Sequence, residues 1–207
     1  MSYICMVANR NGIAVSGDSR LTFQPERLNL HLDNAQKVFS CPEQNMVWAC
    51  CGIMVMAGIN YYKMASWILR QKNRSLTSRL NQISGIMSRA TGAQYRLTRK
   101  GACFTLLLGV IKDGTAQVYV LDAVNGEASL RTLEAPVLIQ SGWVKSLHQP
   151  KPPVSAYQDE SIDQLIARVR ERCLWAMRKD GRLASQEAKH IQTIGGNVRV
   201  VYLKAHS

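Results

Sequence analysis

The sequence predicts an α+β fold in which two antiparallel sheets pack against each other and helices cover them on the outside. Strand-like segments come in runs that are separated by runs of helix-like segments, which argues against the alternating order of a doubly wound parallel sheet. Tight-turn dipeptides join neighbouring strand-like segments, as they do in antiparallel hairpins. The chain has 207 residues, 46% of them hydrophobic, which suffices for one sizeable core and is short for two.

The predicted strands are apolar segments bounded by turn residues. The first two, YICMVAN and GIAVSG, are joined by residues 10–12, which contain Asn-Gly, the strongest short hairpin signal. KVFSC and MVWACCG form a second pair. Later strands are expected at ACFTLLLGVI, AQVYVLDA, ASLRTL and PVLIQSG, and the last at NVRVVYL. Turns at residues 113–114 and 125–126 again carry Asp-Gly and Asn-Gly.

Helices are predicted where apolar residues recur every three or four positions. One such pattern begins at Ile53, and a second begins at Ser75. A third helix follows Ser161, whose hydroxyl suits a helix N-cap. The apolar face of this third helix is expected to consist of Ile162, Leu165, Ile166, Val169, Cys173, Leu174 and Met177.

The chain is strongly basic, with a formal net charge of +12. Such a charge points to an acidic partner or to a nucleic acid. The basic residues are spread out, however, and their densest stretches, RQKNRSLTSR and RVRERCLWAMRKDGR, have helical patterns without a DNA- or RNA-binding motif. We therefore interpret these stretches as solvated helix faces, with nucleic-acid binding kept as an alternative that the salt dependence of binding would test.

The cysteines and the N-terminus bear on the cellular compartment. None of the six cysteines forms a C-x-x-C pair, and most fall inside apolar runs. They are expected to be small buried hydrophobic residues in a reducing compartment, with no metal and no cofactor. No run of 18 apolar residues predicts a membrane span. Because MSYICMVANR lacks a basic leader and a small-residue cleavage site, we expect a cytoplasmic protein.

The second residue offers a chemical group that acts without a histidine. Serine is small, so we expect an aminopeptidase to remove Met1 and to leave Ser2 with a free α-amine. Such an amine has a pKa of about 7.7–8.0 and can serve as the general base for the hydroxyl of its own residue. Ser2 is therefore a candidate nucleophile for acyl transfer.

Three further residues complete a candidate acyl-transfer site. A hairpin that turns at residues 10–12 brings Asp18 close to the strand of Ser2. Lys37, which opens the next strand, would lower the pKa of a nearby amine through like-charge repulsion. The N–H of Gly52, at a strand end before a predicted helix, can face a developing oxyanion with the help of the helix N-terminus.

The order of these segments resembles the proteasome β-subunit family of N-terminal-nucleophile (Ntn) hydrolases. GIAVSGDSRLT is similar to that family's GVVLAADSRAT, and NAQKVF resembles NVKKI, which carries the catalytic lysine. VWACCGIMVMAG, IQSGW and TIGGNVRVVYL are similar to its strand–glycine–helix entry, its G-S-G segment and its final S-G-G with the strand that follows. The start at Met-Ser-Tyr is most similar to bacterial relatives such as Anbu. The resemblance implies a four-layer α-β-β-α sandwich and one domain over residues 2–207.

By this resemblance Ser2 is the catalytic nucleophile, Asp18 and Lys37 are its partners, and Gly52 supplies the oxyanion N–H. The resemblance also implies a catalytic role for Ser141, which falls in the segment similar to G-S-G. Ser2 is itself a departure, because this family normally has threonine there.

The resemblance further implies a substrate-binding side. Thr22 and Cys50 fall where the family's substrate strand and first specificity pocket lie, and Arg20 braces that side. The family's second catalytic aspartate precedes S-G-G. Here Ile194 replaces that serine, and the nearest upstream acid, Asp180, is the candidate for the aspartate.

These residues together predict an Ntn amide hydrolase, a peptidase, that works in a self-assembled ring or open spiral without a metal or cofactor. An unfoldase partner stays unidentified. Two alternatives stay open: a non-peptidase amidase or acyl transferase on the same fold, and a proteasome-like scaffold that has lost turnover.

Overall fold

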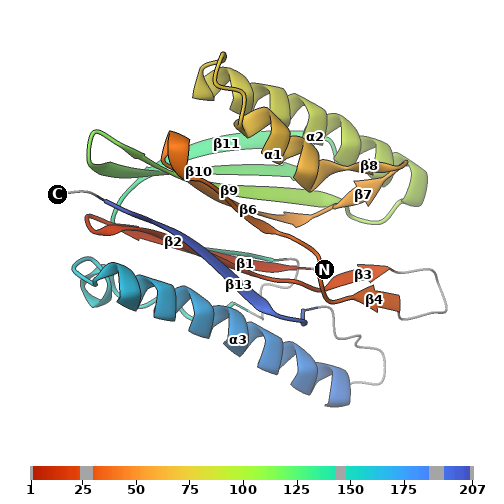
Figure 1. The fold of residues 1–207 in the computed structure, drawn as a ribbon. Coiled ribbons are helices and arrows are strands. Elements are labelled where there is room, and N and C mark those ends of the chain that lie inside the picture. The colour runs from red at the N-terminus through yellow and green to blue at the C-terminus, as the bar shows by residue number, and fades with distance from the viewer. Residues whose placement is uncertain (1, 24–29, 143–147, 187–193, 206–207) are drawn as a thin grey trace.

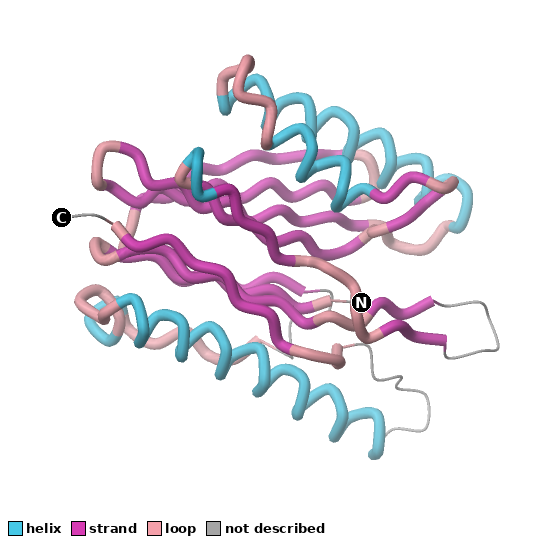
Figure 2. The backbone as a smooth tube through the Cα atoms, in the orientation of Figure 1, coloured by secondary structure: helices cyan, strands magenta, loops and turns pink. Residues whose placement is uncertain are grey.

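The structure is a computed structural model that describes residues 2–23, 30–142, 148–186 and 194–205. It has four layers, with two helices above two stacked sheets and one helix below them (Figure 1). The tube in Figure 2 shows that the strands of the two sheets run in similar directions. The predicted α-β-β-α arrangement is thus confirmed.

The lower sheet contains the first and the last strand of the chain. Its strands follow the order β12 (Val137–Gly142), β1 (Tyr3–Asn9), β2 (Gly12–Asp18) and β13 (Val198–Lys204). All neighbours are antiparallel. The predicted hairpin at residues 10–12 is confirmed, and it places the beginning of β1 and the end of β2 side by side.

The upper sheet is built from the middle of the chain. Its strands follow the order β11 (Glu127–Glu134), β10 (Thr115–Val124), β9 (Cys103–Lys112), β6 (Met46–Gly52) and β5 (Val38–Cys41). A short 3-10 helix, η1 (Pro42–Gln44), turns the chain from β5 into β6. A second one, η3 (Val154–Ala156), lies before the last helix.

Each outer layer covers one sheet. Helices α1 (Tyr61–Leu69) and α2 (Leu76–Thr98) pack on the upper sheet, and α3 (Ile162–Gln186) packs on the lower one (Figure 1). Ser75 caps α2 as predicted, because its hydroxyl accepts the N–H of Ser78 at 3.2 Å. None of the described helices is both long enough and apolar enough to cross a membrane.

Ser161 begins α3 through a reciprocal pair of hydrogen bonds. The Ser161 hydroxyl accepts the N–H of Gln164 at 3.3 Å, and the Gln164 side chain accepts the N–H of Ser161 at 2.8 Å. This capping box satisfies two backbone donors at the helix start, which explains why the helix begins there.

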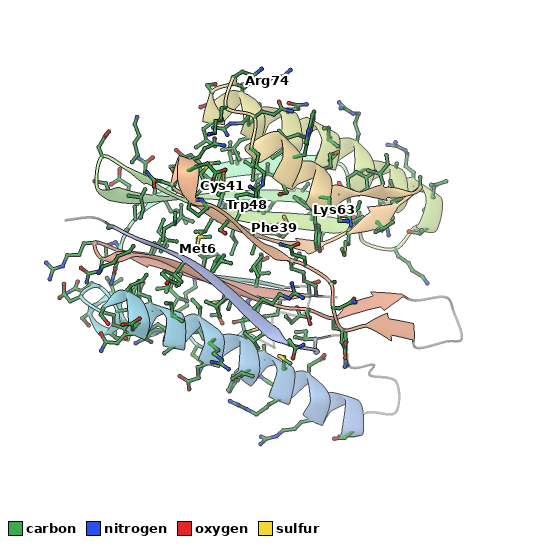
Figure 3. The ribbon with its side chains drawn as sticks, in the orientation of Figure 1. Met6, Phe39, Cys41, Trp48, Lys63 and Arg74 are labelled. Atoms are coloured by element: carbon green, nitrogen blue, oxygen red, sulfur yellow. The ribbon has the colours of Figure 1, made fainter. Side chains whose placement is uncertain are left out.

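Three buried clusters fill the spaces between the layers. The alternation along β6 sends Trp48 toward the helices and its neighbours toward the other sheet. Figure 3 shows Trp48 near Phe39 and places Met6 between the sheets. The rings of Phe39 and Trp48 stack with centroids 5.7 Å apart. Strand β6 therefore contributes side chains to two buried clusters, one on each face of the upper sheet.

Two short ribbons depart from the prediction. The helix expected from Ile53 begins only at Tyr61, because β7 (Val55–Met56) and β8 (Ile59–Asn60) come first. Gly58, with φ +78°, makes the turn between them. The segment before Lys37 forms a second ribbon, β3 (Leu21–Phe23) paired with β4 (Leu30–Leu32).

Candidate active site

A buried ion pair joins the two sheets at one end of the sandwich. The Lys37 ammonium lies 3.0 Å from each carboxylate oxygen of Asp18, and both side chains are fully buried. Asp18 ends β2 in the lower sheet, and Lys37 directly precedes β5 in the upper one. Lys37 also donates to the backbone carbonyl of Arg20. Predicted partners that are 19 residues apart in sequence are therefore in direct contact.

Asp18 also accepts backbone hydrogen bonds from three separate segments. Its donors are the N–H groups of Tyr3 at 2.8 Å, Arg20 at 3.1 Å and Gly195 at 3.3 Å. The Tyr3 nitrogen is bonded directly to the carbonyl carbon of Ser2. The carboxylate is therefore one residue away from the predicted nucleophile, and it fixes the backbone that carries it.

Ser2 is only 4% exposed, and a tyrosine anchors Gly52. The hydroxyl of Tyr62, in the first turn of α1, donates to the Gly52 carbonyl at 3.0 Å. Burial raises the pKa of this phenol well above its usual range. Helix α1 therefore anchors the strand end that carries the predicted oxyanion residue.

Gly52 has a backbone that only glycine adopts without strain. Its φ is +96°, and a Cβ there would lie 2.1 Å from the carbonyl oxygen of Cys103. The prediction that a helix N-terminus directly follows Gly52 is wrong, since the β7–β8 ribbon separates them. The helix dipole therefore has no role at this N–H, and α1 contributes the Tyr62 hydroxyl instead.

Ser141 and a cysteine line the space between the sheets next to this site. Ser141 pairs with Ile4 and shares its face of the lower sheet, the face that Ser2 also takes by alternation. The Ser141 hydroxyl lies 3.5 Å from the Cys51 thiol, and burial raises the pKa of that thiol to about 11. Cys50, expected at a specificity pocket, points to the opposite side and is completely buried beneath the helices.

Arg20 is a brace within the structure, held by two carboxylates. The Arg20 guanidinium donates two hydrogen bonds to the Asp33 carboxylate, at 2.7 and 2.9 Å. The backbone N–H of Arg20 donates to the Asp18 carboxylate. A Cβ on Gly195 would lie 2.5 Å from the Arg20 guanidinium carbon, so glycine permits this close approach. Thr22 lies in β3 opposite His31, and its side chain is outside the described part of the chain.

Asp180 is connected to Asp18 through the backbone of residues 194 and 195. It projects from α3, is completely buried, and accepts the N–H of Ile194 at 2.7 Å. The next N–H, that of Gly195, donates to Asp18. Asp180 therefore positions the turn that supports Asp18.

Solved structures with the same architecture cover nearly all of the chain. An Anbu (Gly-1) mutant from Hyphomicrobium sp. strain MC1 matches 99% of this chain and 82% of its own, with a TM-score of 0.58 and 11% identity. Anbu from Yersinia bercovieri, described as an ancestral beta-subunit, matches 98% of this chain and 80% of its own, with a TM-score of 0.53 and 15% identity. The chain has a proteasome-like, Anbu-like fold. No protein-family model matches the sequence, and neither does any curated protein.

Several residues at the site of this Anbu-like fold were not predicted from the sequence. Tyr62 falls on the apolar face of a helical pattern, and nothing in its spacing indicates that its hydroxyl reaches Gly52. Asp33 and Gly195 hold Arg20 and Asp18. Of these residues, only Gly195 has a recognisable sequence feature, because the Gly-Gly dipeptide at residues 195–196 is typical of a turn.

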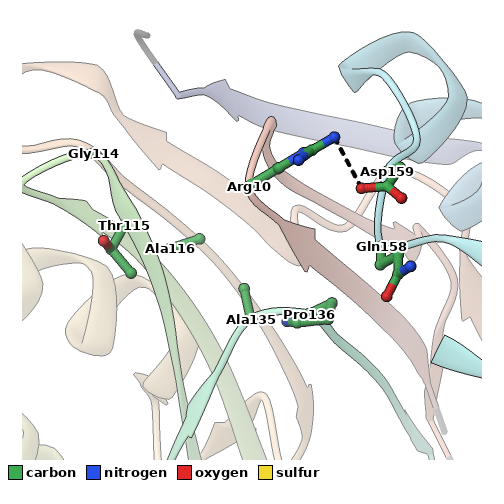
Figure 4. Close-up of a pocket in the computed structure, with 8 residues that line it drawn as sticks. All are labelled: Arg10, Gly114, Thr115, Ala116, Ala135, Pro136, Gln158 and Asp159. Carbon is green, nitrogen blue, oxygen red and sulfur yellow. Dashed lines mark ion pairs between the residues drawn. The ribbon is translucent and has the colours of Figure 1, made fainter. Parts of the chain in front are cut away.

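The Anbu-like fold also has a pocket at the far end of the sandwich (Figure 4). Arg10 and Asp159 form an ion pair of 3.0 Å at its rim, and Ala116 and Pro136 line it. Since β1 has 7 residues and each rises about 3.3 Å, this pocket lies about 23 Å from the ion pair of Asp18. It is therefore separate from the candidate active site.

Metal ligands do not gather in the described part of the chain, where no three His, Cys, Asp or Glu side chains come together. All six cysteines have free thiols. The candidate site contains a serine hydroxyl, an ion pair, a phenol and backbone N–H groups.

Proposed function

We propose that this chain is an N-terminal-nucleophile amide hydrolase that cleaves peptides, with Ser2 as the nucleophile once residue 1 has been removed. The observation that carries the proposal is the Asp18–Lys37 ion pair, buried at the end of the sandwich where the Tyr3 N–H ties Ser2 to Asp18. A buried ion pair next to the backbone of Ser2 supports acyl transfer at that residue.

The reaction begins with the free amine of Ser2. The amine takes the proton of the Ser2 hydroxyl, directly or through a water, while Oγ bonds to the carbonyl carbon of the scissile amide. The C–N bond then breaks, the leaving amine takes the proton, and an ester on Ser2 remains. The α-amine next deprotonates a water, which attacks the ester and releases the acid, and the proton returns to Oγ.

The other residues act on charge and position. The Lys37 ammonium favours the neutral form of a neighbouring Ser2 amine through like-charge repulsion, and Asp18 holds the ammonium in position with two contacts of 3.0 Å. The Gly52 N–H stabilises the oxyanion of the tetrahedral intermediate. Ser141 lies next to the site in contact with Cys51, and Asp180 acts as a positioning residue through Ile194.

We further propose that residues 2–207 form one subunit of a homo-oligomer, a ring or an open spiral, in the cytoplasm. The similarity to a protein described as an ancestral beta-subunit supports this. So does exposed apolar surface at Val55, Ile59 and Trp67, the last of them 65% exposed. These residues lie on the consecutive elements β7, β8 and α1, and apolar surface exposed in one region marks a contact surface.

The test combines mass spectrometry with a covalent probe. The intact mass of the native, untagged protein is expected to lack one methionine. A peptide β-lactone or epoxyketone is then expected to label Ser2 and to stop peptide hydrolysis. Two controls, Ser2→Ala and a variant with an extra residue ahead of Ser2, are expected to show neither labelling nor hydrolysis. The first lacks the hydroxyl, and in the second the amine of Ser2 is part of an amide.

The outcomes separate the candidates. A retained Met1, or unlabelled Ser2 in assembled protein, refutes the hydrolase and leaves the scaffold. Labelling with turnover of small amides but not of peptides indicates an amidase or acyl transferase.

A further inference from the structure

The residue next to the proposed nucleophile is anchored at both of its ends. The backbone N–H of Tyr3 donates to Asp18 at 2.8 Å, and the Tyr3 hydroxyl donates to the side-chain oxygen of Gln140 at 2.5 Å. The Tyr3 ring is completely buried in the cluster between the lower sheet and α3. By alternation along the strand, this face of the sheet is opposite to the one that the Ser2 side chain takes. The phenol therefore holds the beginning of β1 from the side away from the Ser2 hydroxyl.

The acceptor of this bond, Gln140 in β12, is itself fixed by a backbone segment. Its side-chain oxygen accepts the N–H of Gln149 at 3.1 Å, and its side-chain nitrogen donates to the Gln149 carbonyl at 2.7 Å. A backbone N–H can only donate and a carbonyl can only accept, so these two bonds settle the orientation of the Gln140 amide. Its oxygen therefore faces the phenol, and Tyr3 is the donor.

Helix α3 holds the same backbone segment from below. The guanidinium of Arg172, a residue that is only 4% exposed, donates to the carbonyls of Gln149 and Pro150, at 3.2 and 3.0 Å. Hydrogen bonds thus run in an unbroken series from α3 to the residue beside the nucleophile. We call this series the N-terminal clamp; it consists of Tyr3, Gln140, Gln149 and Arg172.

Ser2 depends on its neighbour for a fixed position. Among the described strand pairs, β1 pairs with β12 from Tyr3 onward and with β2 from Ile4 onward, so none of these pairs includes Ser2. Chain ends are poorly ordered unless they are tied down. Once residue 1 has been removed, Ser2 is the chain end, and the N-terminal clamp begins one residue away from it.

We propose that Tyr3 is a positioning residue whose phenol, held by Gln140, keeps the beginning of β1 from fraying. Ser2 is thereby held next to Asp18, with its hydroxyl and amine in place before substrate binds. This inference rests on the proposed function. It gives a role in the reaction to a side chain on the opposite face of the sheet from the nucleophile, where the phenol acts by orientation and not by proton transfer.

The experiment compares processed, untagged wild-type protein with Tyr3→Phe. The variant keeps the ring, and Gln140 keeps both of its bonds to Gln149, so the protein is expected to fold. The first readout is the maximal rate of labelling of Ser2 by a peptide β-lactone. This rate is expected to fall about two- to tenfold, the range for one lost hydrogen bond. The probe concentration that gives half the maximal rate is expected to change by less than about twofold, since no contact with the probe is lost.

The second readout does not depend on the reaction. Hydrogen exchange of the amides of residues 4–8, measured by mass spectrometry of the N-terminal peptide, is expected to be about two- to tenfold faster in Tyr3→Phe. Exchange of β13, at the other edge of the same sheet, is expected to stay at the wild-type rate. Faster exchange in both strands would indicate a general loss of stability and would overturn the inference.

Tyr119→Phe is the matched control, because the Tyr119 hydroxyl also donates to a glutamine side chain, that of Gln117, at 3.1 Å in the upper sheet. It is expected to label Ser2 and to exchange residues 4–8 at the wild-type rates. An unchanged labelling rate or unchanged exchange of residues 4–8 in Tyr3→Phe overturns the inference and leaves the proposed function standing. Unlabelled wild-type protein refutes the hydrolase instead, and the exchange rates then test the clamp without the reaction.

A double-variant cycle tests whether the phenol acts through Gln140. In a Gln140→Ala protein, the further substitution Tyr3→Phe is expected to change the labelling rate by less than about twofold, since the acceptor is already gone. Equal losses with and without Gln140 overturn the inference. If Gln140→Ala does not fold, the comparison of Tyr3→Phe with Tyr119→Phe decides.

Discussion

Lys37 and Asp18 join the two sheets of the sandwich through an ion pair in which neither side chain is exposed to solvent. The ammonium is equidistant, at 3.0 Å, from both carboxylate oxygens. Such a pair affects stability as well as chemistry, because removing one buried partner leaves the other charge uncompensated.

Lys37→Ala is expected to abolish labelling of Ser2 and to lower the free energy of unfolding by about 3–5 kcal/mol, because it leaves a buried carboxylate without its cation. Asp18→Ala should cost more, since it also removes the acceptor of three backbone N–H groups. Urea unfolding of the purified variants measures both values.

The control is Arg131→Ala, which breaks an exposed ion pair of 2.9 Å with Asp122. It should cost less than about 1 kcal/mol. A Lys37→Ala protein as stable as Arg131→Ala contradicts the prediction.

Gly52→Ala is expected to disrupt the oxyanion site, because a Cβ would lie 2.1 Å from the Cys103 carbonyl and the backbone has φ +96°. One strand must then shift, so labelling of Ser2 should be lost and the free energy of unfolding should fall. Gly58→Ala is the matched control. Gly58 also has a positive φ, +78°, but nothing lies within 4 Å of its Cβ position. Its cost is expected to be about 1–2 kcal/mol, with labelling retained. If both variants lose equal stability, the steric argument at Gly52 fails.

The sequence predicts best where a local rule and the final structure agree. The Asn-Gly hairpin sets the register of β1 and β2, and the Ser161 capping box starts α3. These local features and the order of strands and helices are enough to predict the four-layer arrangement. The contact between Asp18 and Lys37 follows from the resemblance and from the position of each residue at a strand end.

The sequence predicts poorly where two structures satisfy the same spacing. The apolar residues after Gly52 fit a helix, but Gly58 at a positive φ turns them into a two-stranded ribbon. The contacts of Tyr62 and Asp180 come from helices that pack on opposite sides of the sandwich. Such contacts depend on tertiary packing, which periodicity does not encode.

Asp180→Ala is expected to weaken the site without touching Ser2. The variant leaves the buried N–H of Ile194 without this carboxylate, which costs about 1–3 kcal/mol. The adjacent Gly195 then loses its fixed position beneath Asp18, so the labelling rate should fall severalfold. Asp180→Asn keeps an oxygen acceptor and should retain most of both stability and rate. Equal labelling by wild type and Asp180→Ala would show that the turn is held by other contacts.

The cysteines provide a test of which atom is the nucleophile. Burial raises the pKa of Cys51, beside Ser141, to about 11, and that of Cys103 to about 12. The reactive thiolate forms only as the pH rises through these values, so at pH 8 about one Cys51 in a thousand is ionised. Iodoacetamide at pH 8 should therefore leave both thiols largely unmodified in the native protein and should leave β-lactone labelling unchanged. The same reagent should modify all six cysteines after unfolding in urea, which mass spectrometry counts. Rapid alkylation of Cys51 in the native protein with parallel loss of labelling would place a thiol, not the Ser2 hydroxyl, at the centre of the chemistry.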